Sequence, residues 1–189
     1  MRWRDVGYWW GTTEAERARS YPCDTVLPGW NEGWYRAVDV AAPPEVVFRW
    51  VCQLRAAPYS YDWIDNLGRR SPPHLTPGLE SLEVGQRVMS IFELVDFEAG
   101  QHLTARLRKP GVFPALAISY CVSETAPGQS RLLGKLVLTF GDGLYHRFVR
   151  LLLPWADWIM MRKQLLTLKR YAEASSLVAS GRNVQRSAQ

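Results

Sequence analysis

Residues 34–51 read WYRAVDVAAPPEVVFRWV, and the spacing of their apolar side chains changes halfway through. In the first half, apolar and polar positions alternate loosely, which is typical of a half-buried strand over residues 34–41. The alternating side chains are apolar Tyr35, Val38 and Val40 and polar Arg36 and Asp39. A strand is therefore predicted at the start of this stretch.

The second half of the stretch has the signature of a helix start. Pro44 suits the first helical turn, where its missing N–H costs no hydrogen bond, and Glu45 suits the positive end of the helix dipole. The apolar residues that follow are spaced to share one helical face, namely Val46, Val47, Trp50, Val51 and Leu54. We expect this face to pack on a sheet.

Downstream of this helix, turn signals alternate with strand-like runs. Pro58 ends the helix, and Ser60 can cap a short second helix over residues 61–67 that Gly68 terminates. Turns that contain Pro or Gly separate most of the later runs, as in an antiparallel meander. The predicted strands are 86–92, 93–97, 102–108, 116–123 and 131–140.

The last long segment, from Leu144 to about residue 180, has helical spacing. Pro154 either kinks this helix or starts its second half. A strand, two helices, a run of strands and one long helix form an α+β pattern. We expect a curved antiparallel sheet wrapped around the long C-terminal helix, with two short helices after the first strand and a cavity between sheet and helix.

Residues 1–33 precede this domain and are rich in tryptophan and tyrosine. A disordered segment rarely carries so much aromatic surface, so we expect this extension to pack on the domain and to cover part of the cavity. A short helix is predicted around residues 13–19, with Thr12 or Thr13 as its cap. The predicted organisation is an extension over 1–33, one domain over 34–180 and a polar tail over 181–189.

Composition narrows the class of protein. The chain has 189 residues, 47% hydrophobic and 22% charged, which suits one globular domain and excludes a disordered or fibrous chain. Its net charge of +5 permits an anionic partner without requiring one. The spacing of Cys23, Cys52 and Cys121 suits neither a disulfide framework nor a zinc site, so free thiols in a reducing compartment are expected. The sequence pattern shows neither a secretory leader nor a membrane-spanning stretch, and the chain is expected to be cytoplasmic.

Four stretches of the chain resemble the START-like superfamily, also called SRPBCC, which includes polyketide cyclases and lipid-transport proteins. Residues 40–51 resemble the superfamily's passage from strand to helix, and residues 161–173 are similar to its closing helix. YSYDWIDNL at residues 59–67 and WWGTTE at residues 9–14 resemble segments of a bacterial subgroup. The resemblance implies the helix-grip fold of the birch-pollen allergen. It transfers no activity, because a fold does not determine chemistry.

The segment over residues 59–67 is the main candidate for ligand contacts, because aromatic rings offer flat apolar walls and hydroxyl and amide groups can orient a ligand. On the strands, Arg106 and Tyr120 would bind a carboxylate or polarise a carbonyl if both faced the cavity. Each of these interpretations has an alternative without a ligand. In the alternative for the segment, Tyr61 and Trp63 only plug the open end of the sheet. In the alternative for the strands, Arg106 is an outer-face cation and Tyr120 a core residue. The predicted ligand-binding residues are Tyr59, Tyr61, Trp63, Asn66, Arg106, Tyr120, Trp158 and Arg162.

Other kinds of site are not predicted. His74, His102 and His146 lie far apart, without the spacing or cysteine partners of a metal site, so no metal is expected. Phosphate-binding glycine loops, a nucleophile elbow and nucleic-acid motifs are missing from the sequence, so neither a cofactor nor a nucleic-acid partner is expected. Residues 144–155 combine arginines with large apolar side chains and would suit an anionic membrane surface, but burial on the sheet is the preferred explanation.

The predicted function is binding of a small hydrophobic or amphipathic molecule in the internal cavity, for transport or sequestration. One alternative is an enzyme similar to polyketide cyclases or dehydratases, which would need at least two ionisable or hydroxyl groups converging on one point of that cavity. Another is a protein-interaction or co-chaperone module, which would have a closed cavity and an exposed apolar patch. The sequence makes no prediction of the oligomeric state.

Overall fold

The computed structural model describes residues 6–65, 68–109, 111 and 113–187. At its centre is a seven-stranded sheet with the strand order β1-β2-β7-β6-β5-β4-β3. The strands are β1 (Trp9–Trp10), β2 (Glu32–Val40), β3 (Arg87–Val88), β4 (Phe92–Glu98), β5 (His102–Leu107), β6 (Ala115–Ala126) and β7 (Gln129–Thr139). The helices are α1 (Glu14–Ala18), α2 (Pro22–Val26), α3 (Pro44–Cys52), α4 (Asp62–Asp65) and α5 (Leu144–Ser187), with a 3₁₀ turn, η2 (Gln53–Arg55), after α3.

Antiparallel pairing connects the sheet from β2 to β3, and the two-residue strand β1 adds to its edge in parallel with β2. In the β2–β7 pair, Trp34 lies opposite Leu136. The predicted antiparallel meander is therefore confirmed for the domain. Strand β1 makes the whole sheet mixed, and its two residues are too few to leave a periodic signal in the sequence.

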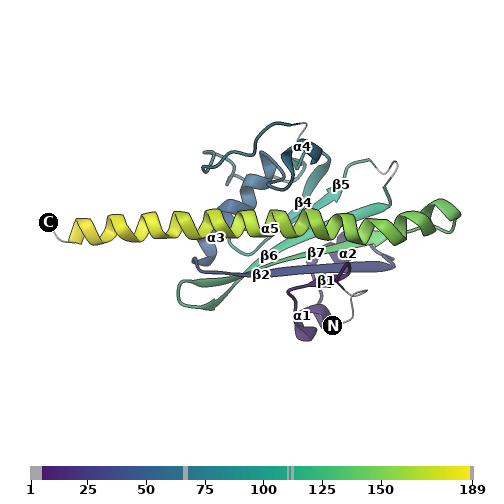
Figure 1. Cartoon of the computed structure of the whole chain (residues 1–189), viewed down its shortest axis with the longest axis horizontal. Coiled ribbons are helices and arrows are strands. Elements are labelled where there is room, and N and C mark those ends of the chain that lie inside the picture. Colours follow the sequence, from purple (N-terminus) through teal and green to yellow (C-terminus); the bar gives the residue numbers. More distant parts are fainter. Residues whose placement is uncertain (1–5, 66–67, 110, 112, 188–189) are drawn as a thin grey trace.

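Helix α5 crosses one face of the sheet and reaches past it at both ends (Figure 1). It runs unbroken through Pro154, so this proline lies within one long helix and does not start a second one. Helix α3 packs on the same face, because Val47 and Val51 on its buried side join the core that α5 and the sheet share. With α3 and α4 following β2, this is the α+β helix-grip architecture that the sequence predicts.

The predicted strand over residues 86–92 is wrong for most of its length. Only Arg87 and Val88 form β3, and β4 begins at Phe92. Between them, Met89 and Ser90 have φ angles of 46° and 64°, in the left-handed region that residues with a side chain rarely adopt. The N–H of Met89 donates to the carbonyl of Leu54 at 2.8 Å, so the chain bends toward η2. A tertiary hydrogen bond thus overrides the local strand pattern.

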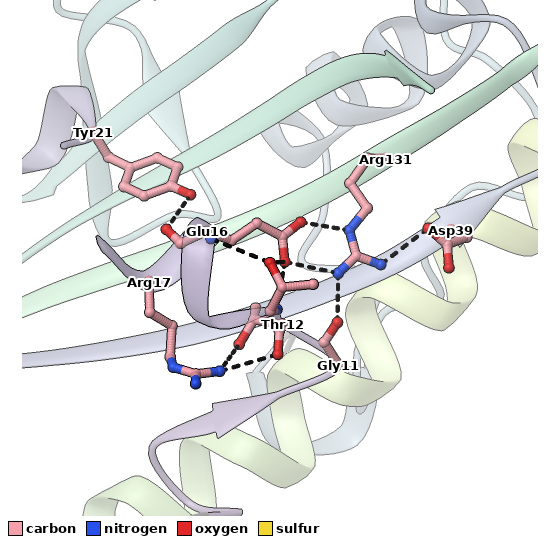
Figure 2. A network of polar contacts seen from close by, with 8 residues as sticks. Gly11, Thr12, Glu16, Arg17, Tyr21, Asp39 and Arg131 are labelled. Atoms are coloured by element: carbon pink, nitrogen blue, oxygen red, sulfur yellow. Dashed lines mark hydrogen bonds and ion pairs between the residues drawn. The ribbon is translucent and has the colours of Figure 1, made fainter. Parts of the chain in front are cut away.

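The N-terminal extension is attached to the sheet through Arg131 of β7. Figure 2 shows its guanidinium donating to the Glu16 carboxylate at 2.7 Å and to the carbonyl of Gly11 at 2.5 Å. Thr13 caps α1 in a capping box with Glu16, which confirms the predicted short helix and one of its two predicted caps. Hydrogen bonds from Arg131 lower the pKa of Glu16 from 4.5 to about 2, so this attachment is ionic at neutral pH.

Helix α2 covers the face of the sheet opposite α5. Cys23 is fully buried there, and its N–H donates to Ser119 Oγ at 2.9 Å. Lys135 of β7 pairs with Asp24 at 2.6 Å, and its side chain is only 2% exposed. Its ammonium group lies about 5 Å from the ring centres of Tyr21, Trp30 and Tyr35. Two aromatic residues of the extension, Tyr21 and Trp30, therefore help to enclose a cation on the outer face of the sheet.

Candidate functional site: a cavity between the sheet and α5

A cavity of about 280 Å³ lies between the sheet and the first half of α5, and we call it the α5 cavity. The strands contribute Trp34, Leu107, Leu116, Leu136 and Leu138 to its wall. Helix α5 contributes Leu153, Ala156, Asp157 and Met160, and the loops contribute Ile91, Phe113 and Pro114. All of these side chains except Asp157 are apolar, so the cavity offers a ligand almost no hydrogen-bonding groups.

The periods of strand and helix bring these residues together. Leu136 and Leu138 are two positions apart on β7, so both point to the face that α5 covers. Trp34 lies opposite Leu136, and its ring is held by a hydrogen bond from Nε1 to Glu32 Oε1 at 3.0 Å. The lining residues Ala156, Asp157 and Met160 of α5 lie three, four and seven positions after Leu153, which aligns them on one side of the helix.

Asp157 is the one ionisable side chain among the described residues that line the α5 cavity. Its carboxylate accepts a hydrogen bond from Arg36 Nη2 at 2.9 Å, and the exposed fractions of the two side chains are 12% and 0%. Burial raises the pKa of Asp157 from 3.8 to about 6, although Arg36 acts in the opposite direction. Asp157 can therefore change its protonation state near neutral pH in apolar surroundings.

Arg36 is fixed by carbonyl groups as well as by Asp157. Its guanidinium donates to the carbonyls of Gly7 at 2.7 Å, Tyr8 at 2.8 Å and Tyr35 at 2.9 Å. The extension thus positions Arg36, and Arg36 positions Asp157. None of residues 6–33 lines the α5 cavity, so the prediction that the extension covers it is wrong for its described part.

Further along α5 the same space is filled by side chains. Tyr120 is fully buried, and its hydroxyl donates to Gln164 Oε1 at 2.6 Å, while Gln164 Nε2 donates to the carbonyl of Pro58 at 2.6 Å. Burial raises the pKa of Tyr120 well above its usual value. Met161 packs so closely on Gly134 that a Cβ there would lie 2.8 Å from Met161 Cε. Helix and sheet touch here, and the α5 cavity does not extend into this region.

Tyr59, the first residue of the predicted contact segment, is a core residue outside the α5 cavity. It is 1% exposed, and its ring meets those of Trp50 and Tyr171 edge-on, with centroid distances of 6.1 Å. Its hydroxyl has no hydrogen-bond partner in the part of the chain that the structure describes. Burial raises the pKa of Tyr59 to about 12, so the phenol stays protonated.

The other described residues of that segment, 60–65, do not line the α5 cavity either. Trp63 is 76% exposed, which leaves it too far out in solvent to plug the sheet, and Tyr61 is half-buried. The Asp62 carboxylate accepts hydrogen bonds from the N–H and the hydroxyl of Ser71, at 2.7 and 2.5 Å, so it anchors the following loop. Asn66 lies outside the described residues.

The structure does not gather the other predicted residues into one site. Arg106 is exposed, and because its neighbours on β5 belong to the core under α5, its side chain lies on the opposite face. Arg162 is exposed on α5, over the ring of Trp10 at 5.4 Å. Trp158 is half-buried next to Asp157 without lining the cavity. Tyr120 is the core residue that one of the sequence alternatives describes.

The most distinctive pair of the site, Asp157 and Arg36, was missed by sequence reasoning. Asp157 carries a signal, since it is the only acidic residue between Asp142 and Glu173. Arg36 was missed because the sequence pattern was interpreted with Tyr35 on the same side of β2 as Val38 and Val40, and with Arg36 among the polar positions. In the structure Arg36 shares the inner face with Trp34 and Val38, whereas Tyr35 joins the outer cluster.

A larger hollow of about 590 Å³ lies between α3 and α5 and is named here the α3–α5 groove. None of the described residues in its wall belongs to a strand. Its lining residues are Val46, Arg49, Trp50, Pro73, His74, Leu75, Tyr171, Ala174, Ser175, Val178 and Ala179. The Trp50 indole already donates to Ser175 Oγ at 3.0 Å and stacks on Tyr171, so it is engaged within the protein. We therefore regard the α5 cavity as the better candidate.

The sequence predicts that the large apolar residues at the start of α5 are buried on the sheet, and this prediction is wrong for four of them. The exposed fractions are 84% for Leu144, 62% for Phe148, 67% for Leu151 and 51% for Leu152. Val149 and Leu153, on the other side of the helix, pack against the core. The start of α5 therefore has apolar residues on its solvent side as well as on its core side, unlike an ordinary amphipathic helix.

Cysteine and metal chemistry find little support in the described residues. The three cysteines are free, and burial raises the pKa of Cys23 to about 11 and those of Cys52 and Cys121 to about 12, so they are protonated thiols at neutral pH. Within the described residues, no group of three or more His, Cys, Asp or Glu side chains could hold a metal ion. None of the described helices has the length and apolar character needed to cross a membrane.

No protein-family model matches the chain, and no curated protein is similar enough in sequence to count as a relative. Solved structures do match it. The KanY protein is 15% identical with a TM-score of 0.51, and the match covers 77% of this chain and 99% of that one. A hypothetical protein from Helicobacter pylori is 13% identical with a TM-score of 0.51, over 82% and 96% of the two chains. The Zhui aromatase/cyclase from Streptomyces sp. R1128 is 15% identical with a TM-score of 0.48, over 75% and 93%.

At identities this low, the matches concern the fold alone. The features that define the fold are an antiparallel sheet that continues from β2 to β3, two helices directly after β2, and the long closing helix α5. This chain has an α+β helix-grip fold.

Proposed function

We propose that the protein binds a small hydrophobic or amphipathic molecule in the α5 cavity, for transport or sequestration. The observation that carries the proposal is an apolar hollow of about 280 Å³ in the space that the sheet and α5 enclose. Small-molecule sites begin at roughly this size, about 300 Å³, and are lined mainly by apolar side chains. Burial of an apolar ligand there would be favourable by about 25 cal/mol per Å² of apolar surface.

The neighbouring packing supports this proposal. Beside Tyr120 and Gln164, the same sheet and helix enclose a solid core, so the fold does not require a hollow. Ile91, Phe113 and Ala156 of the cavity lining are exposed, so apolar surface of the cavity is in contact with solvent. An apolar ligand would remove this surface from water and add dispersion contacts for Trp34, Leu136 and their neighbours.

An enzyme that acts in the same cavity has weaker support. Asp157, with its pKa raised to about 6, is a suitable proton donor or acceptor. A cyclase or dehydratase needs a second ionisable or hydroxyl group that converges on the reacting atom. The described lining residues include none besides Asp157. Binding is therefore the function that the geometry supports best.

The proposal is tested with two matched substitutions on α5 and the neutral fluorescent probe N-phenyl-1-naphthylamine. Ala156 and Ala174 are both exposed helix residues, and they line the α5 cavity and the α3–α5 groove respectively. Ala156→Trp should fill the α5 cavity and weaken probe binding at least tenfold, while Ala174→Trp should leave it unchanged. The opposite pattern would move the site to the α3–α5 groove and refute the proposal. The proposal would also be rejected if native mass spectrometry of the purified protein found no co-purified small molecule and the unaltered chain did not bind the probe.

A further inference from the structure

Ile91 and Phe113 of the α5 cavity lining are about half exposed, and we call this solvent-facing side of the cavity its mouth. A second hollow of about 440 Å³ adjoins the cavity, and both are lined by Ile91, Leu107 and Phe113. The second hollow is also lined by three basic residues, which we call the basic rim: Arg87, Arg108 and Lys109. No acidic residue lines it among the described residues. A molecule that leaves the apolar cavity through this mouth therefore enters a positively charged environment.

Backbone geometry brings the basic rim together. The N–H of Arg108 donates to the carbonyl of Ile91 at 3.0 Å, which ties the end of β5 to the bend that follows β3. Arg87 lies in β3, directly before that bend. Two cations that are twenty-one positions apart in the chain thus lie on either side of one hollow. The left-handed residues Met89 and Ser90, which break the predicted strand, are what turns the chain to this position.

The side chains of the basic rim are available to a ligand. All three are exposed, and none forms an ion pair with another of the described residues. Glu93 is opposite Arg87 in the β3–β4 pair, yet it does not line the hollow. The buried cations Arg36 and Lys135, in contrast, are already paired with Asp157 and Asp24. The basic rim is a set of unpaired positive charges next to an apolar hollow.

Inside the cavity, in contrast to the mouth, the electrostatic environment disfavours an anionic group. Asp157 lies in the wall and takes up the charge of Arg36, so an anionic group placed deep in the cavity would meet a carboxylate and no free cation. The same group at the mouth would meet the basic rim while remaining in contact with water, which avoids the penalty of burying a charge. The two environments together favour one orientation of an anionic ligand, with its charged group at the mouth and its apolar part in the cavity.

We propose that the ligand is an anionic amphiphile whose apolar chain occupies the α5 cavity and whose carboxylate or phosphate head lies at the basic rim. This inference rests on the proposed function, because it adds a head group to the apolar molecule that the cavity takes. It identifies Arg87 and Arg108 as residues that determine specificity. The apolar walls provide affinity for any chain of suitable size, and the basic rim selects among head groups.

The test compares three ligands that share a ten-carbon chain: decanoate, decyl phosphate and decan-1-ol. Each displaces N-phenyl-1-naphthylamine from the unaltered protein and from two double variants. Arg87→Gln with Arg108→Gln removes two charges from the basic rim. Lys163→Gln with Arg170→Gln removes two exposed charges from α5 outside the lining of either hollow, and serves as the control.

The rim variant should bind the anionic ligands about tenfold more weakly, since two exposed charge contacts are worth about that much together. Its affinity for decan-1-ol should stay within about twofold, and the control variant should resemble the unaltered protein with all three ligands. A larger effect on decyl phosphate than on decanoate would indicate a phosphate head, and the reverse a carboxylate. Equal losses in the rim and control variants, or an unchanged affinity of the rim variant for both anions, would overturn the inference. If the inference fails in this way but decan-1-ol still displaces the probe, the proposed function remains supported. If none of the three ligands displaces the probe, the proposed function itself is rejected.

Discussion

The space between the sheet and α5 has one hollow end and one filled end. At the hollow end, Trp34 and Leu136 face Ala156 across about 280 Å³. At the filled end, Tyr120 and Gln164 are joined by a hydrogen bond of 2.6 Å and no such space remains. The sheet and the helix are the same at both ends, so the difference comes from the side chains. A fold can therefore provide a binding cavity without any change in its backbone plan, by the placement of small and large residues along one helix.

The largest effect is expected from removal of the cation that supports the hollow end. Arg36→Ala should lower the free energy of unfolding by about 3 to 5 kcal/mol, because it leaves the Asp157 carboxylate buried without a partner. Arg36→Met combined with Asp157→Leu should recover the part of this loss that comes from the unpaired Asp157 carboxyl, but not the part that comes from the hydrogen bonds to the carbonyls of Gly7, Tyr8 and Tyr35. Chemical denaturation of the three proteins measures the difference. A double variant no more stable than Arg36→Ala would show that the pair is not the cause.

At the filled end the corresponding test is Gln164→Ala. It removes the acceptor of the Tyr120 hydroxyl and the donor to the Pro58 carbonyl, and should lower the free energy of unfolding by about 2 to 4 kcal/mol. Met160→Ala, one turn earlier at the hollow end, should lower it by only about 1 kcal/mol because this side chain already borders empty space. Similar losses for the two variants, measured by thermal and urea unfolding, would remove the distinction between the two ends.

The pH dependence of stability should separate the hollow end from the attachment of the extension. The pKa of Asp157 is higher in the folded chain, about 6 against 3.8, so the folded state binds more protons between these values and this group makes the protein less stable as pH rises through them. The pKa of Glu16 is lower in the folded chain, about 2 against 4.5, so its contribution is present above pH 4.5 and is lost as pH falls toward 2. Carboxyl carbon NMR titrations should give a higher midpoint for Asp157 than for Glu16. An Asp157 midpoint below that of Glu16 would contradict the assignment.

The smallest effect is expected for Trp63→Ala. This ring is 76% exposed and does not line the α5 cavity, so the free energy of unfolding should change by less than about 0.5 kcal/mol and the affinity for N-phenyl-1-naphthylamine should not change. Fluorescence titration checks the affinity. A clear loss of probe binding in a folded variant would return the segment around Trp63 to the binding site.

Local patterns were enough to predict most elements of the fold. The change of period between β2 and α3, the turns between the later strands and the helical spacing of α5 all correspond to elements of the structure. The pattern failed at Met89 and Ser90, where a hydrogen bond to the Leu54 carbonyl bends the chain. Such a bond joins residues far apart in sequence, so no local window contains it.

The site could be predicted much less well. Tyr59 and Tyr120 have the chemistry expected of ligand contacts, but both are packed within the core. Asp157 has a sequence signal as an isolated acidic residue, yet its position in the cavity wall depends on which side of α5 meets the sheet. That orientation is set by packing along the whole helix.

By itself, the sequence determined the α+β class, the order of strands and helices and the start of the closing helix, because these follow from hydrophobic period, turn residues and caps within short windows of chain. The end of that helix was predicted near residue 180, whereas α5 continues to Ser187. Only the tertiary structure decided which end of the gripped space is hollow, that Arg36 and Asp157 meet in its wall, and that Arg87 and Arg108 stand at its mouth. The physical reason is that a cavity is a property of surfaces from several elements. Its volume depends on strand register and helix rotation, which are set by packing between distant segments and not by the local sequence of any one of them.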